Sequence, residues 1–197
     1  MTPLRIPLFP LNTVLFPGGL LPLRVFEARY MDMTRDCMKN AAPFGVCLIR
    51  EGREVGAPAT PESIGCLAQI TDWDMRQLGL LQLKTQGVQR FRIQDRETGA
   101  NGLISANVEL LTVEAPLQLP EQFAGCARLL QRVVKEQGTQ VFEEPHRFDD
   151  AVWVSYRLSE ILPVPMPARQ QLLELTDTLA RLAILQQFLG QRVLSSG

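Results

Sequence analysis

The chain has 197 residues, of which 46% are hydrophobic and 21% charged, and its formal net charge is −1. This composition is typical of a globular protein with a hydrophobic core and excludes the disordered and fibrous classes. The 20 Lys and Arg residues are balanced by 21 Asp and Glu residues, so the chain has no net positive charge with which to attract nucleic acid. No apolar run reaches the length of a signal peptide or a membrane span, so we expect a cytoplasmic protein that does not bind membranes.

The cysteines are widely spaced and include no CxxC pair, and the chain has a single histidine, His146. A zinc site needs several such ligands at close spacing. We therefore expect no metal and no cofactor, and we interpret the thiols as buried and free. These thiols belong to Cys37, Cys47, Cys66 and Cys126.

Strand patterns dominate the first 115 residues. The segment 80–85 alternates apolar and polar residues, as does the segment 103–113, which is typical of an antiparallel sheet with one wet face. Several short strands of this kind suggest a small barrel or sandwich. One helix is expected at 26–41, because Phe26, Tyr30, Met33, Cys37 and Ala41 recur at helical spacing. The expected strands are 4–9, 20–25, 44–49, 64–72, 80–85, 88–94 and 103–113.

Helical patterns dominate after the proline-containing stretch 114–120, which we interpret as a boundary. A helix opens at Glu121 and ends near Gly138, a suitable C-cap. A second is expected at 149–162, with Val152, Trp153, Tyr156 and Ile161 inward. Pro167 can start the next helical segment, and Asp177 can cap a last helix over 178–194. The residues expected inward on that last helix are Leu179, Leu182, Ala183, Leu185, Phe188, Leu189 and Val193.

The stretch PLFPLNTVLFPGGLLPLRVFEARY at residues 7–30 resembles the start of the Lon protease N-terminal domain family, also called the Lon substrate-binding domain. Later segments at 44–46, 64–68, 87–93 and 162–182 are similar to the following parts of that family. The residues that carry the first match, called the signature residues below, are Pro10, Phe16, Pro17, Gly18, Pro22, Phe26, Glu27, Arg29 and Tyr30.

The resemblance implies an α+β fold in which a PUA-like β pseudo-barrel with one inserted helix is followed by a C-terminal α-helical bundle. It implies a barrel subdomain over 1–115, a helical subdomain over 116–197, and recognition of proteins or peptides. The sequence contains no GxxxxGK[ST] phosphate loop. It is therefore similar to stand-alone bacterial members of the family, without ATPase or protease modules.

The signature residues Glu27, Arg29 and Tyr30 place a carboxylate near a basic group, an arrangement that acid–base chemistry can use. We favour a structural role, in which Glu27 caps backbone N–H groups at the helix start and Tyr30 buries its ring. The Pro17-Gly18-Gly19 segment is likewise interpreted as a turn and not as an anion-binding loop, because an apolar strand follows it.

Catalytic chemistry has few candidates in this sequence. His146 lies among acidic residues on a loop between helices, where a general base or metal ligand is uncommon. No GxSxG motif presents a serine nucleophile, and a cysteine nucleophile has only His146 as its partner. We expect no catalytic residues, and a small-molecule hydrolase that acts through a Cys–His or carboxylate site remains a third hypothesis.

Trp73 and Met75 are placed by the strand pattern between two strands, among charged residues that favour water. Tryptophan and methionine offer large adaptable contact areas, so Trp73, Met75 and Leu78 are our candidate peptide-binding residues. Alternatively, Trp73 folds back as a lid on the barrel end. Both interpretations stay open at this point.

The leading hypothesis is a non-enzymatic protein and peptide recognition module that holds exposed apolar segments of other proteins, with a chaperone or protease as a possible downstream partner. The alternative is an RNA- or nucleotide-binding PUA-like protein, in which Arg90 and Arg92 contribute a basic face. Nearby acidic residues offset those two arginines, which disfavours nucleic acid as the partner.

Overall fold

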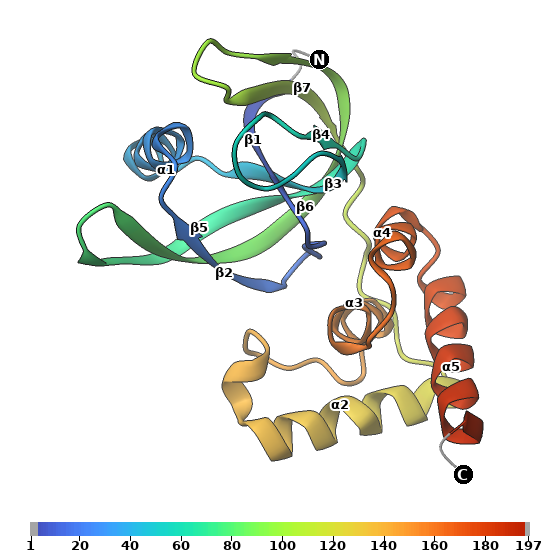
Figure 1. Cartoon of the computed structure of the whole chain (residues 1–197). Helices are drawn as coiled ribbons and strands as arrows, with labels where there is room; N and C mark the ends of the chain where they lie inside the picture. The colour runs from blue at the N-terminus through green and yellow to red at the C-terminus, as the bar shows by residue number, and fades with distance from the viewer. Residues whose placement is uncertain (1–3, 196–197) are drawn as a thin grey trace. The chain divides into compact units, whose positions relative to one another are not determined.

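The structure of the protein is a computed structural model that describes residues 4–195, with side chains through residue 191. The chain divides into two compact units, Met1–Val113 and Glu114–Gly197. Strands and one helix make up the first unit, and the second is helical, which confirms the predicted α+β class (Figure 1). The strands are β1 (Leu4–Leu11), β2 (Leu20–Val25), β3 (Phe44–Glu51), β4 (Thr60–Pro61), β5 (Ile64–Gln77), β6 (Leu80–Thr98) and β7 (Ile104–Leu110). The helices are α1 (Ala28–Asn40), α2 (Ala124–Gln137), α3 (Ala151–Ile161), α4 (Met166–Glu174) and α5 (Thr178–Ser195), with short 3₁₀ turns at Glu121–Phe123 and Thr139–Val141.

The strands form one mixed sheet in the order β1-β7-β6-β5-β3-β4, and β2 pairs with β6 beside this path. All pairings are antiparallel except that of β1 with β3, where Leu8 lies opposite Gly45. This parallel pairing connects distant strands of the path, so the sheet curls into a pseudo-barrel. The single inserted helix, α1, packs on it through Tyr30, Met33 and Cys37.

The long strand β6 replaces the two strands predicted at 80–85 and 88–94. It pairs with β2 before Gly87 and with β7 from Phe91 onward. At Gly87 the chain passes against the β1–β2 connection, since Gly18 N donates to Gly87 O at 2.7 Å and Gly87 N donates to Gly19 O at 2.8 Å. A Cβ on residue 87 would lie 2.1 Å from Phe16 O. Gly87 therefore permits a close crossing within the strand and does not end it.

Helix α1 begins two residues later than predicted. Tyr30, Met33 and Cys37 are buried as expected, but Phe26 precedes the helix and is 56% exposed. Ala41 ends the helix in the left-handed region with φ 50° and is exposed, so it does not extend the buried face. The predicted helical face that runs from Phe26 to Ala41 is therefore wrong at both ends.

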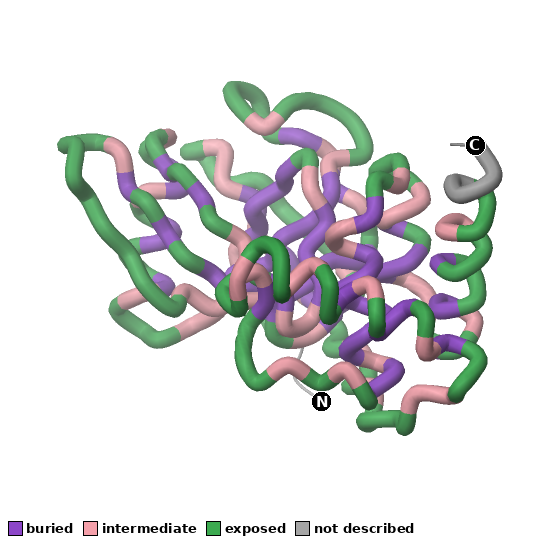
Figure 2. Tube along the Cα trace, turned by 90° about the horizontal axis from the view of Figure 1, so that it is seen from below, coloured by how far each residue is buried: buried purple, intermediate pink, exposed green. Residues whose placement is uncertain are grey.

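Two groups of buried side chains make up the core of the first unit. One lies between α1 and the strands, where the Phe9 ring stacks on the Tyr30 ring with centroids 4.0 Å apart. The other joins β1, β3, β5, β6 and β7 around Leu8 and Phe91. The burial falls off along the β5–β6 hairpin, whose end is exposed (Figure 2).

In the second unit, α3 is buried on almost every side. Trp153 and Tyr156 are buried as predicted, whereas Val152 and Ile161 are only partly covered. Asp150 caps the helix by accepting a hydrogen bond from Val152 N at 3.0 Å. No helix within the described residues is both long and apolar enough to cross a bilayer.

A buried ion pair organises the end of the second unit. Arg181 of α5 has no exposed surface and pairs with Glu114, while its Nε donates to Ser155 Oγ at 3.1 Å. Its guanidinium lies over the Tyr156 ring, 4.2 Å from the centroid. The buried face of α5 is made by Thr178, Arg181, Leu182 and Leu185. Leu182 and Leu185 are buried as expected and Phe188 and Leu189 partly so, but Leu179 and Ala183 are exposed, against the prediction, and Val193 lies outside the described side chains.

Candidate recognition surfaces

Strand β5 runs on through Trp73 and Met75, and the turn that follows contains Leu78 and Gly79. The two side chains thus lie on the strand and not in the connection between strands, where the sequence pattern placed them. Trp73 is 57% exposed, Met75 37% and Leu78 95%. The lid interpretation of Trp73 is wrong, because a lid would bury the indole. Trp73, Met75 and Leu78 together are called the hairpin surface below.

The hairpin surface continues a buried row of the sheet. Trp73 lies directly opposite Leu83 of β6, and Leu83 lies opposite Leu23 of β2. Directly opposed side chains point to the same face of a sheet, so these three residues share one face. Leu23 and Leu83 are buried in the core under α1, but Trp73 lies past its edge. Lys84 Nζ lies 2.8 Å from Asp72 Oδ2 on the polar side, and this contact lowers the pKa of Asp72.

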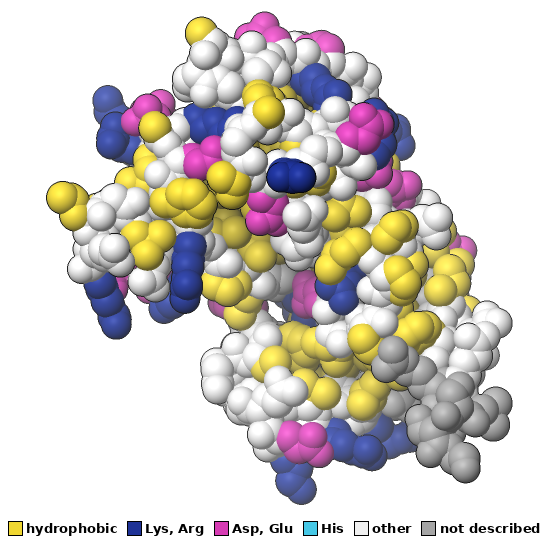
Figure 3. Space-filling model, in the orientation of Figure 1, with side chains coloured by type: hydrophobic (Ala, Val, Ile, Leu, Met, Phe, Trp, Pro, Cys, Tyr) yellow, Lys and Arg dark blue, Asp and Glu magenta, His cyan; other side chains and the backbone are white. Residues whose placement is uncertain are grey.

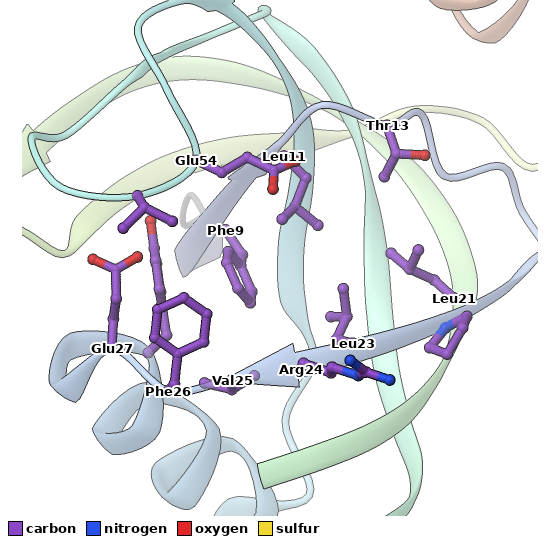
Figure 4. Close-up of a pocket in the computed structure, with 13 residues that line it drawn as sticks. Phe9, Leu11, Thr13, Leu21, Leu23, Arg24, Val25, Phe26, Glu27 and Glu54 are labelled. Atoms are coloured by element: carbon purple, nitrogen blue, oxygen red, sulfur yellow. The ribbon is translucent and has the colours of Figure 1, made fainter. Parts of the chain in front are cut away.

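A pocket of about 390 Å³ lies between β1, β2, the start of α1 and the loop that precedes β4 (Figure 4). Its inner wall is formed by buried apolar side chains, including Phe9, Val25 and Tyr30. Two exposed apolar side chains, Phe26 and Val55, each 56% exposed, line its mouth from different elements. Figure 3 shows hydrophobic side chains gathered in this part of the first unit, with charged ones at their margin. No residue of the hairpin surface lines the pocket.

The signature residues Glu27 and Tyr30 line the pocket, and Arg29 contacts both of them. Arg29 is buried, with Nη2 2.9 Å from Glu27 Oε2, and its Nη1 donates to Gly102 O at 3.1 Å. The guanidinium also lies 4.6 Å from the centre of the Tyr30 ring. Burial raises the pKa of the Tyr30 hydroxyl, which Arg29 opposes.

The prediction that the Glu27 side chain caps α1 is wrong. Its carboxylate makes no cap hydrogen bond; instead, its backbone carbonyl accepts hydrogen bonds from Tyr30 N at 3.0 Å and Met31 N at 2.9 Å. The side chain turns toward Arg29 and pairs with its guanidinium instead. Glu27 thus contributes a carboxylate to the pocket lining.

The remaining signature residues belong to strands and turns. Pro10 lies in β1 opposite Cys47, and Phe16 is fully buried. Gly18 has φ 73°, and Gly19 N donates to Phe16 O at 2.9 Å, which shows the predicted turn after Pro17. Pro22 lies in β2 and also lines the pocket.

The four thiols are buried and free, as predicted. Burial raises the pKa of Cys37 to about 11 and also raises the pKa values of Cys47 and Cys126. His146 packs among the rings of Phe142, Phe148 and Trp153, and its Nε2 lies 3.0 Å from Thr139 O. Within the described residues, no group of three or more His, Cys, Asp or Glu side chains is placed to hold a metal ion. These environments give the Cys–His hydrolase no support.

The basic face that the RNA- or nucleotide-binding alternative needs from Arg90 and Arg92 is absent from the described surface. Arg90 is 3% exposed, and Arg92 Nη1 lies 4.0 Å from Glu109 Oε2. A phosphate-binding strand needs adjacent, accessible cations. Neither arginine supplies that arrangement, so the RNA- or nucleotide-binding alternative is not supported.

Comparisons with known proteins agree with this architecture. The chain is 28% identical over 201 residues to Lon protease 2 of Herpetosiphon aurantiacus, covering 98% of this chain and 24% of that protein. It thus spans about a quarter of the length of the curated relatives it matches. The Lon N-terminal domain protein of Xanthomonas campestris is 35% identical with a TM-score of 0.78, covering 93% of this chain and 98% of that one.

The N-terminal domain of the Mycobacterium avium complex Lon protease has the same fold, with a TM-score of 0.64 at 16% identity; the match covers 92% of this chain and 95% of that one. A model of the ATP-dependent protease La (LON) substrate-binding domain matches residues 5–191. Because this match covers nearly the whole chain, the chain belongs to the family of LON substrate-binding domains.

Proposed function

We propose that this protein is a non-enzymatic recognition module that binds exposed apolar segments of other proteins. The observation that carries the proposal is the hairpin surface, where Trp73, Met75 and Leu78 are all exposed at the end of one hairpin. The family description, a substrate-binding domain of a protease, supports protein segments as the ligand class.

The chemistry of the hairpin surface suits varied apolar partners. Tryptophan offers a large rigid contact area, and the flexible methionine side chain adapts to different shapes. The Trp73 side chain shares a face with the buried Leu83, so a partner docked there extends the core of the sheet. Asp72 and Lys84 pair with each other beside it, which leaves no strong net charge for the partner to match.

The test measures binding of a permanently unfolded protein, such as reduced and carboxymethylated lysozyme, by fluorescence anisotropy. The Trp73→Ala/Met75→Ala variant should weaken binding about thirtyfold, because an aromatic hot spot contributes about 2 kcal/mol or more. The matched control is Val88→Ala, which removes an exposed apolar side chain of β6 that lies outside the hairpin surface. It should bind like the wild type.

Two results would count against the proposal. Wild-type protein that fails to bind any unfolded protein or apolar peptide at tens of micromolar is not a recognition module of this kind. Equal loss of binding in Val88→Ala and in the double variant shows that the hairpin surface has no special role.

A further inference from the structure

We propose that the pocket between β1, β2 and α1 is a second contact site for a protein segment. The pocket takes a large apolar side chain of that segment, and it selects segments in which this side chain has a basic residue on one side and an acidic residue on the other. The inference rests on the proposed function only in that the ligand is a protein segment. The pocket shares no lining residue with the hairpin surface.

The mouth of the pocket is built for an apolar occupant. Phe26 lies just before α1 and Val55 on the loop before β4, and both are more than half exposed although they line a cavity. Behind them, the stacked rings of Phe9 and Tyr30 form a rigid inner wall. An apolar side chain that enters the pocket removes Phe26 and Val55 from water, which favours its binding.

The two walls carry opposite, uncompensated charges. Arg24 projects from β2, and Glu54 stands on the opposite wall beside Leu11 of β1 (Figure 4). Arg24 makes no ion pair with any described residue. Among the described residues, Glu54 accepts a hydrogen bond only from the backbone N–H of Asn12, at 2.5 Å, which holds its carboxylate at the rim without neutralising it.

The third charge of the lining, Glu27, is already matched. Its carboxylate pairs with the buried Arg29, so it adds little net charge at the mouth. The unpaired charges that remain are the negative Glu54 and the positive Arg24, on opposite walls of the pocket. A segment with a cation near Glu54 and an anion near Arg24 is complementary to these charges, and the reversed segment meets like charges.

The experiment compares two nine-residue peptides of identical composition, acetylated and amidated, with central Glu-Phe-Lys or Lys-Phe-Glu between Gly and Ser residues. Their hydrophobicity and net charge are the same, so only the order of charges differs. One order should bind the wild type about fivefold more tightly at low salt, since rim ion pairs contribute up to about 1 kcal/mol. The preference should shrink as salt increases.

Charge variants assign the preference to this pocket. The double variant Arg24→Glu/Glu54→Arg should reverse the preferred order, and Glu54→Gln, which keeps an acceptor for Asn12 N, should weaken the preference. Phe26→Ala should reduce binding of both peptides about tenfold, because the apolar contact is common to both. Trp73→Ala/Met75→Ala should leave the order preference intact. Thermal melting of each variant verifies that it is folded.

The outcomes separate this inference from the proposed function. Equal affinity for the two peptides, or a preference that the charge-swapped variant keeps, overturns the pocket assignment while binding of unfolded protein can still stand. An unchanged affinity in Phe26→Ala places the segment elsewhere and also overturns it. Failure of the wild type to bind both peptides and the unfolded protein overturns both proposals.

Discussion

Trp73 and Leu83 lie directly opposite each other on β5 and β6, yet Leu83 is 2% exposed and Trp73 57%. The two side chains point to the same face of the sheet, and only Leu83 lies deep enough to be covered by the core under α1. The apolar side chains on this face of the sheet thus continue from the buried Leu83 to the exposed Trp73.

This relationship predicts opposite stability effects at the two positions. Trp73→Ala should change the free energy of unfolding by no more than about 0.5 kcal/mol, as exposed sites do. Leu83→Ala should cost about 2 to 5 kcal/mol, because it leaves a cavity in the core. Urea unfolding of both variants measures the difference. A large loss in Trp73→Ala would show that the indole is covered in solution.

Gly87 should tolerate no side chain. A Cβ there meets Phe16 O at 2.1 Å, so Gly87→Ala must break the crossing with the β1–β2 connection and should cost about 2 kcal/mol or more. Gly190→Ala in α5 is the control, because nothing lies within 4 Å of its Cβ position and alanine favours helices by about 1 kcal/mol. Thermal melting should therefore move down for the first variant and not for the second. Equal melting temperatures would contradict the crossing.

The buried pair of Arg181 and Glu114 should show strong coupling. Arg181→Met leaves the Glu114 carboxylate without its cation at a site where that side chain is 11% exposed, and it should cost about 3 to 5 kcal/mol. In Arg181→Met/Glu114→Gln the second change removes the stranded charge, so the double variant should lose less than the sum of the single variants. A double-mutant cycle by urea unfolding measures the coupling. Simple additivity would show that the pair does not interact.

The cysteines should react slowly in the folded protein. Burial raises the pKa of Cys37 to about 11, so little thiolate forms at pH 8, and iodoacetamide should modify the thiols only after unfolding. The pKa of the Cys37 thiol is higher in the folded state, about 11, than in the unfolded chain, about 9. The protonated thiol therefore contributes fully to stability below pH 9, and this contribution is lost as the pH rises from about 9 to 11. Cys37→Ala should therefore destabilise less at pH 11 than at pH 8. Rapid labelling of one thiol at pH 7 would revive the hydrolase hypothesis.

Local patterns in the sequence were sufficient for the secondary structure of most segments and for the family. Alternation along residues 103–113 and the helical spacing of Tyr30, Met33 and Cys37 report on which side chains face a core, and that preference is local. The turn at Gly18 and the cap at Asp177, whose Oδ1 accepts from Ala180 N at 3.0 Å, follow from residue types that suit those backbone positions.

Tertiary structure decided where those elements stop and which side chains meet. Gly87 has the appearance of a strand end, but its lack of a side chain serves a crossing with residues 16–19 that no local pattern reveals. Glu27 suits a cap by residue type, but its carboxylate pairs with Arg29, whose guanidinium also donates to the backbone carbonyl of Gly102. The pocket joins residues from 9 to 55, and the exposure of Phe26 and Trp73 depends on how far the core extends. Contacts between distant segments set these features, and a sequence read one window at a time does not contain them.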